Sequence, residues 1–283
     1  MNIKLIYTFL FSFSFFYLSG QIISVNKSCF FNETELLGHI KILSSDLYEG
    51  RRTGTKGAER ARKYIINESY KLGVLKINKT HQQPFSFIYQ GKEYAGTNVI
   101  GFIEGDTFPN KYIVISAHYD HEGIKNGEIY NGAKHSIILA AFDGEELGLQ
   151  GSKYFVKNPP VNIKNIKLNV NLDMISRSDK NELFVAGTSD NKSLKYIISN
   201  IEQSCNLKII AGHDGYDGLE NWTYSSDHAN FYKKGIPFLY FRVEDHKDYH
   251  EPTDDFENIQ PKFYIEAVKS IIPILNKIDN SGF

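Results

Sequence analysis

The sequence has few residues of the kinds that define several special classes of protein. Its 283 residues include two cysteines, Cys29 and Cys205, too few for a disulfide scaffold, and whether these two pair stays open. Thiolate ligands for zinc are also too few, so any metal must be held by histidines and carboxylates. Neither sign of charge dominates, because 32 Lys and Arg balance 33 Asp and Glu. We therefore expect no nucleic-acid partner.

Long hydrophobic runs are missing after the first 20 residues. Residues 1–20 have the parts of an export signal: Lys4 provides a positive start, residues 5–18 are apolar, and small residues precede a cleavage point after Gly20. The apolar stretch is shorter than the ~20 residues that span a bilayer. We expect a signal peptide, with a membrane anchor as the alternative. A secreted or periplasmic mature chain (21–283) without a transmembrane segment follows.

The remainder reads as a globular protein, since 41% hydrophobic and 23% charged residues exclude a disordered or collagen-like chain. Apolar residues at helical spacing predict helices at 33–43, 58–72, 194–201 and 261–275. Near-continuous apolar and β-branched runs predict buried strands at 98–103, 112–116, 136–142, 167–172, 182–185 and 237–241. Helices that alternate with buried strands predict one layered α/β domain over residues 21–283.

Residues that can bind metal follow four of these predicted strands. They are His118 and Asp120, then Glu145 and Glu146, then Asp173, and last a loop with Asp245, His246, Asp248 and His250. The carboxyl ends of strands line the ligand crevice in open α/β sheets. Mixed carboxylate and imidazole ligands suit Zn²⁺, Mn²⁺ or Co²⁺. Each segment alone fits a surface turn or a helix start equally well, but together they predict a hydrolytic metal centre.

Two adjacent glutamates can divide the tasks of such a centre. A pair of zinc ions polarises a substrate carbonyl and lowers the pKa of a bridging water. A general base must lie beside that water without binding metal. Glu145 and Glu146 leave a strand in different directions, so one can act as base and the other as ligand. The predicted reaction is hydrolysis of an amide next to a free amine.

The motifs together resemble the co-catalytic di-zinc aminopeptidases, metallopeptidase family twenty-eight, over most of residues 35–260. They are SDLYEGRRTG (45–54), AHYDHEG (117–123), AAFDGEELG (140–148), NLDMI (171–175), SDH (226–228), GIP (235–237) and DYHEPTD (248–254). The resemblance implies a zinc-exopeptidase-like α/β domain, with a central mixed and largely parallel sheet flanked by helices on both faces. It also implies two zinc ions and peptide substrates with a free N-terminus.

The resemblance assigns roles to individual residues. His118 and Asp173 would ligate one zinc ion, and Glu146 and His250 the other. Glu145 would be the general base.

Further roles follow from the same resemblance. Asp120 would orient His118 as a partner outside the ligand shell. Ser226, Asp227 and His228 would line the substrate pocket, with a structural loop role as the alternative.

One segment departs from the family pattern. In the family, a Tyr-Asn-Gly-Ala segment runs into two aspartates and a helix, and the first aspartate bridges the metals. Here residues 130–133 run directly into Lys134 and the next predicted strand. The explanations are an incomplete gene model, a true deletion in an inactive relative, or replacement of the bridge by Asp143 or His135. Loss of the helix also predicts that one face of the sheet is left partly bare.

The predicted function is an exported zinc-dependent aminopeptidase that removes N-terminal residues from peptides and is impaired if the bridge is truly absent. One alternative is a catalytically inactive member of the same fold that binds a peptide or protein, insensitively to chelators. A second alternative is a glutaminyl-cyclase-like transferase, which would cyclise N-terminal glutaminyl peptides. Side-chain preference and oligomeric state leave no signal in the sequence.

Overall fold

The computed structural model describes residues 32–120, 135–201, 206–251, 253–254 and 256–281. The chain from Phe31 to Phe283 forms one compact unit. The predicted signal peptide, both cysteines and the segment in which the sequence departs from the family pattern lie outside the described residues. In the described part, no helix has both the length and the apolar character needed to cross a membrane.

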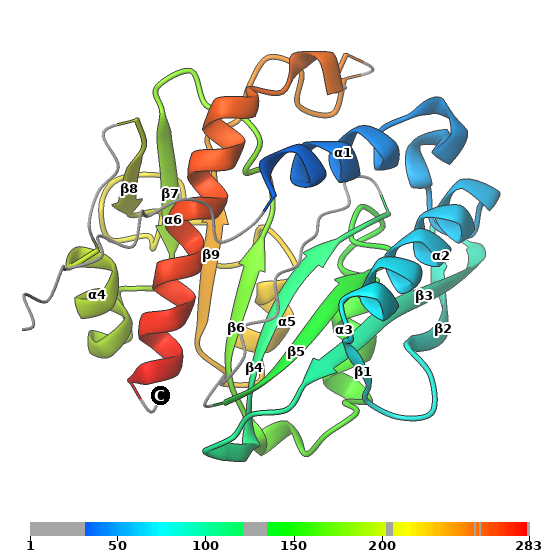
Figure 1. Ribbon diagram of the computed structural model, residues 1–283, viewed down its shortest axis with the longest axis horizontal. Helices are drawn as coiled ribbons and strands as arrows, with labels where there is room; N and C mark the ends of the chain where they lie inside the picture. Colours follow the sequence, from blue (N-terminus) through cyan, green and yellow to red (C-terminus); the bar gives the residue numbers. More distant parts are fainter. Residues whose placement is uncertain (1–31, 121–134, 202–205, 252, 255, 282–283) are drawn as a thin grey trace, which may run out of the picture. The chain divides into compact units, whose positions relative to one another are not determined.

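A single mixed sheet of nine strands forms the centre of this unit (Figure 1). Its order is β1-β3-β5-β4-β6-β9-β7-β8, and β2 pairs with β3. The four central strands β5, β4, β6 and β9 are parallel, whereas β3 runs antiparallel to β5 and β7 antiparallel to β9. The strands are β1 (Leu75–Lys76), β2 (Gln82–Tyr89), β3 (Lys92–Ile103), β4 (Phe108–His118), β5 (His135–Phe142), β6 (Ile166–Leu172), β7 (Glu182–Ala186), β8 (Lys208–Ala211) and β9 (Phe238–Arg242).

Helices cover both faces of the sheet. Figure 1 shows α1, α2 and α6 in front of it and α3 and α5 behind it. The α-helices are α1 (Glu33–Leu43), α2 (Lys56–Lys71), α3 (Gln150–Lys157), α4 (Lys192–Ser199), α5 (His228–Tyr232) and α6 (Pro261–Asn280). Short 3₁₀ segments are η1 (Asp46–Arg51), η2 (Ile163–Asn165) and η3 (Phe256–Asn258).

Alternate residues of the central strands pack into different cores. Val114 and Ile138 face backward and pack with Phe155 of α3 and Phe231 of α5. On the front face, residues of β6 and β9 such as Leu168 and Leu239 pack against the apolar stripe of α6, which includes Ile271 and Ile274. Burial on both faces explains why these strands read as continuous apolar runs.

The front face of β4 and β5 is less completely covered than the back face. Val114 and Ile138 are fully buried, whereas their neighbours Ile115 and Leu139, which point to the front, are only partly buried. Loss of the helix that the family carries in this region predicts that one face of the sheet is less well covered than the other.

Candidate metal centre

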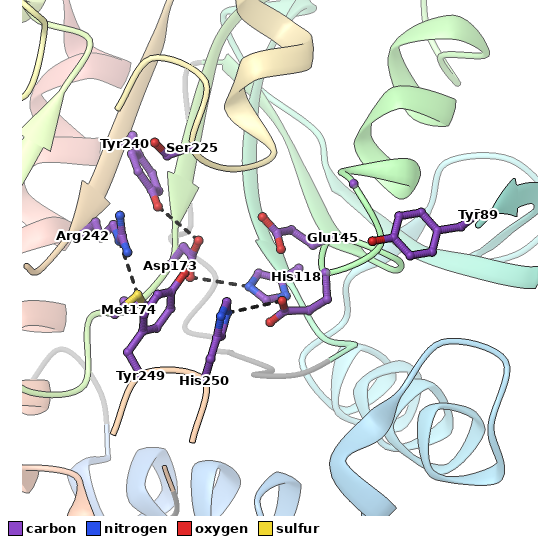
Figure 2. A pocket seen from close by; sticks show the side chains of 12 residues that line it. Tyr89, His118, Glu145, Asp173, Met174, Ser225, Tyr240, Arg242, Tyr249 and His250 are labelled. Atoms are coloured by element: carbon purple, nitrogen blue, oxygen red, sulfur yellow. Dashed lines mark hydrogen bonds and ion pairs between the residues drawn. The ribbon is translucent and has the colours of Figure 1, made fainter. Parts of the chain in front are cut away.

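Parallel strands bring the predicted site residues to one edge of the sheet. His118 is the last residue of β4, and Asp173 directly follows β6. The turn after β5 carries Glu145 and Glu146, and its Gly144 has a φ of +73°, a conformation that side chains rarely adopt. Figure 2 shows the side chains of His118, Glu145 and Asp173 converging on one pocket, which Glu146 also lines.

The first histidine–carboxylate pair is buried. His118 Nε2 lies 3.5 Å from Asp173 Oδ1. On the other side of its ring, His118 Nδ1 donates to Asp120 Oδ1 at 3.2 Å. That hydrogen bond fixes the ring and leaves Nε2 to act as a metal ligand. Tyr240 donates its hydroxyl to Asp173 Oδ2 at 3.1 Å, which orients the carboxylate.

The second pair lies nearer to solvent. His250 Nε2 is 3.4 Å from Glu146 Oε2. His250 has a φ of 58°, as Met174 beside Asp173 has a φ of 57°. Residues other than glycine rarely adopt this backbone conformation, and those that do are concentrated at functional sites. The strained backbone here directs both segments toward the pocket.

The spacing within each pair fits zinc. Two donor atoms at the usual zinc distances and a tetrahedral angle lie about 3.3 Å apart. The two observed separations, 3.5 Å and 3.4 Å, are close to that value. Imidazole nitrogen and carboxylate oxygen are also the donors that zinc accepts in catalytic sites. Each pair can therefore supply two ligands to one ion, leaving positions for water and substrate.

Glu145 lies close to one member of each pair. Ligand atoms of His118, Glu145 and Glu146 all fall within 4.8 Å of one another. Burial is the main reason that the pKa of Glu145 is raised to about 9; Asp227, Asp173 and Glu146 add to the rise and His118 opposes it. In the metal-free site this carboxyl therefore holds its proton at neutral pH, and a cation bound beside it would favour the ionised form that a general base needs.

The same charges act on His118 and Asp173. Burial by itself lowers the pKa of His118, but Glu145, Asp120 and Asp173 together raise it well above its usual value. Burial likewise opposes ionisation of Asp173, yet the hydrogen bond and charge of His118 hold its pKa below the usual range. The metal-free site thus holds an imidazolium between carboxylates, so binding of a cation displaces a proton.

Asp120 connects the two pairs. Besides accepting from His118, it accepts the backbone N–H of Glu146 at Oδ2, at 3.3 Å. It is buried and lies two residues beyond β4. One carboxylate thus contacts both the histidine of the first pair and the loop that carries the carboxylate of the second pair.

Asp143 is a candidate for replacing the bridging aspartate, but both of its carboxylate oxygens accept hydrogen bonds from other segments. Its Oδ1 accepts from the Thr53 hydroxyl at 2.8 Å, and its Oδ2 accepts from Thr97 N at 2.8 Å and the Tyr119 hydroxyl at 3.0 Å. These bonds tie the SDLYEGRRTG segment to β3 and β4. Asp143 therefore serves as a structural junction. The side chain of His135, the other candidate, lies outside the described residues.

The predicted pocket-lining residues lie behind the pocket wall. Ser226, Asp227 and His228 are fully buried, and Ser225 lines the pocket instead. Two of them make internal hydrogen bonds: Ser226 Oγ accepts from the amide of Asn171 at 3.0 Å, and His228 Nε2 donates to Trp222 O at 2.9 Å. The expectation of a lining role for these residues is corrected accordingly, and the structural alternative fits.

The pocket has a volume of about 320 Å³. Beside the predicted residues, it is lined by Tyr89, Gly148, Met174, Ser225, Tyr240, Arg242 and Tyr249. No role for Arg242 was predicted, although a charged residue directly after the apolar run 237–241 was a usable signal. Tyr89 gave no signal, because it reaches the site from the end of the β2–β3 hairpin, far away in sequence.

Two histidine–carboxylate pairs and an interposed glutamate at the carboxyl edge of a parallel sheet define a metal-dependent hydrolase site. The model of Peptidase family M28 matches residues 128–274, more than half of the chain, and the chain belongs to this family. The family is one of metallopeptidases, which are hydrolases. The match includes Glu145, Glu146, Asp173 and His250. No curated protein sequence matches the chain.

Solved structures share the fold at low sequence identity. The zinc aminopeptidase BSAP from Bacillus subtilis is 16% identical, with a TM-score of 0.63, over 86% of this chain and 95% of that one. A Zn-dependent exopeptidase from Parabacteroides distasonis is 15% identical, with a TM-score of 0.63, over 87% and 98%. A glutaminyl cyclase from Porphyromonas gingivalis is 14% identical, with a TM-score of 0.64, over 87% and 98%. These likenesses establish the zinc-exopeptidase fold predicted from the sequence.

Proposed function

We propose that this protein is a zinc-dependent aminopeptidase, exported by its N-terminal segment, that removes N-terminal residues from peptides. The observation that carries the proposal is the position of Glu145, whose carboxylate lies within 4.8 Å of His118 from one ligand pair and Glu146 from the other. A base placed between two metal positions is what hydrolysis of an amide by an activated water requires.

Each residue has a defined task. His118 with Asp173, and Glu146 with His250, would hold zinc, which when bound polarises the substrate carbonyl and lowers the pKa of a water. Glu145 accepts the proton of the attacking water at its carboxylate and delivers it to the leaving amine. Asp120 keeps the His118 ring in place through Nδ1.

The hydrogen-bond acceptors of the pocket favour substrates with a free amino terminus. Glu145, Glu146 and Asp173 place three carboxyl groups around one small pocket. A free amine can donate hydrogen bonds to their oxygen atoms, whereas an internal peptide has no amine to place there. Release of residues from the N-terminus follows from this selection.

The decisive measurement is zinc content together with peptide hydrolysis. The purified mature protein, dialysed against a zinc-buffered solution, should hold close to two zinc ions per chain and release N-terminal amino acids from unblocked peptides. Acetylated peptides should resist. Mass spectrometry of the exported protein should show a mature chain that starts at Gln21. Zinc near zero, with no hydrolysis, would overturn the proposal.

The alternative functions are separated by the same preparation. Cyclisation of glutaminyl peptides, without hydrolysis of other peptides, would indicate a transferase of the glutaminyl cyclase type. Peptide binding that persists in chelator, without hydrolysis, would indicate a non-catalytic binding protein. The segment around residues 130–134, where the family's bridging aspartate is missing, makes both controls necessary.

A further inference from the structure

A buried arginine forms part of the pocket wall. Arg242, the last residue of β9, is only 7% exposed and lines the pocket with Met174 and Tyr249. In Figure 2 it lies beyond Asp173, on the side opposite to Tyr89. A buried cation is unexpected beside a site built to hold zinc, because two zinc ions already carry more positive charge than the ligand carboxylates of Asp173 and Glu146 offset.

The guanidinium group is held in a fixed orientation. The ring of Trp222 lies 4.9 Å from its central carbon and the ring of Tyr249 lies 5.5 Å from it. Its Nε donates to Met174 Sδ at 3.3 Å, and its Nη2 pairs with Asp245. Aromatic contacts and hydrogen bonds at several atoms leave the side chain little freedom, so the group is preorganised to bind a ligand.

The contacts of Arg242 within the protein do not occupy all the hydrogen-bond donors of its guanidinium group. Thioether sulfur is a weak acceptor, and the one paired carboxylate, Asp245, is 59% exposed at its side chain. Among the described residues, Nη1 has no acceptor within hydrogen-bond distance. Burying a guanidinium group whose N–H donors lack acceptors costs free energy. A second carboxylate would accept hydrogen bonds from the remaining donors.

We propose that Arg242 binds a carboxylate of the substrate, and that the enzyme consequently prefers peptides whose N-terminal residue is glutamate or aspartate. The proposal rests on the aminopeptidase function. The scissile carbonyl and the amine must lie at the metal ligands, so the N-terminal side chain is the substrate group nearest to Asp173 and Met174. Arg242 adjoins both of these residues. The remaining peptide leaves toward the side of Tyr89.

The test compares substrates that differ by one charge. For the zinc-loaded protein, kcat/KM should be about 10- to 100-fold higher for Glu 4-nitroanilide than for Gln 4-nitroanilide, the range that one charged hydrogen-bonded pair supplies. Arg242→Met should lower the Glu/Gln ratio to near one, and Arg242→Lys should retain part of it. Lys233→Met removes a cation that stacks on Tyr224 outside the pocket and should leave the ratio unchanged. Equal rates for Glu and Gln in the wild type would overturn the proposal.

A second arm identifies the source of the carboxylate. Leu-Gly and Leu-Gly amide differ only in the C-terminal charge, and their kcat/KM ratio should be insensitive to Arg242→Met. A preference for Leu-Gly that the substitution removes would assign Arg242 to the C-terminus of dipeptides and overturn the N-terminal preference.

Binding separates failure of this inference from failure of the proposed function. Calorimetry of the zinc-loaded protein with glutamate α-amide and glutamine α-amide needs no turnover. Tighter binding of glutamate α-amide, by at least about tenfold and lost in Arg242→Met, supports the role of Arg242 even if no peptide is cleaved. Equal binding of the two amides, with hydrolysis of other peptides intact, refutes the inference and leaves the aminopeptidase function standing.

Discussion

Arg177 donates from Nη2 to Asp248 Oδ2 at 2.8 Å, and this buried pair joins the segment that follows Asp173 to the loop that carries His250. Arg177 Nη1 also donates to Asn258 O at 2.9 Å, beyond that loop. One side chain therefore couples a ligand of the first proposed zinc ion to a ligand of the second.

Breaking this pair should loosen the metal centre. Arg177→Met leaves the Asp248 carboxylate with the Thr253 hydroxyl but without its cation, which should lower the free energy of unfolding by more than the loss of a surface ion pair does, and should lower zinc content through the His250 loop. Urea unfolding and elemental analysis measure both effects. Arg60 pairs with Glu49 at an exposed site, so Arg60→Met should cost under about 1 kcal/mol. Equal costs for the two variants would contradict the coupling.

The two adjacent glutamates should fail in different ways. Glu145→Gln should lower kcat by about 10²-fold or more, because the general base is lost, while zinc content stays at the wild-type level. Glu146→Gln should lower zinc content, because an amide is a poorer ligand than a carboxylate. Assays with a peptide nitroanilide and elemental analysis separate the two. Wild-type rates in Glu145→Gln would refute the role of base.

Replacing Asp120 should weaken zinc binding. Asp120→Asn removes the anionic acceptor of the His118 Nδ1 proton and presents an amide to one of its two partners, so zinc affinity should fall about 10- to 100-fold. Competition with a chromophoric chelator measures the change. Asp106→Asn, at an exposed position, serves as the matched control and should bind zinc as the wild type does. An unchanged affinity in Asp120→Asn would show that His118 needs no such orientation.

Acid should destabilise the protein through His228. Burial is the main cause that lowers its pKa to about 4, from the ordinary 6.5. Because the folded pKa is lower than the unfolded one, the stabilising contribution of neutral His228 is complete above pH 6.5 and is lost as pH falls toward 4. The loss reaches about 3 kcal/mol. Unfolding free energies across this range should fall less steeply for His228→Gln, and parallel curves would exclude the effect.

The two faces of β5 should tolerate truncation differently. Ile138→Ala removes a fully buried side chain from the core behind the sheet and should cost about 2–5 kcal/mol. Leu139→Ala acts on the partly exposed front face and should cost less than half as much, because less apolar surface returns to water. Denaturant unfolding of both variants tests this. Equal costs would mean that the front face is as well packed as the back.

Local patterns predicted most of the elements but not all of them. The helix expected over residues 33–43 has those bounds, and the six expected strands are present, each longer by a few residues or shifted by one. The strands β1, β2 and β8 and the helices α3 and α5 were not predicted. Phe85 and Phe87 of β2 stack on each other and lie in a polar, partly exposed hairpin, so no continuous apolar run marks it. Helix α5 has only five residues and is set by packing against the sheet.

The proposed metal ligands could be predicted from the sequence because each lies at the end of an apolar strand or in the loop that follows one. Parallel strands end at a common edge, so the sequence predicts that His118, Glu146, Asp173 and His250 lie close together. Site residues that belong to short motifs at strand ends can therefore be predicted from the local sequence.

Other properties of the site arise only when distant segments pack together. Burial gives Glu145 its raised pKa, three donors from separate segments occupy Asp143, and internal hydrogen bonds hold Ser226 and His228 behind the pocket wall. Arg242 acquires its position from Trp222 and Tyr249 on either side. Desolvation and side-chain packing depend on neighbours far away along the chain, so the tertiary structure alone decides them.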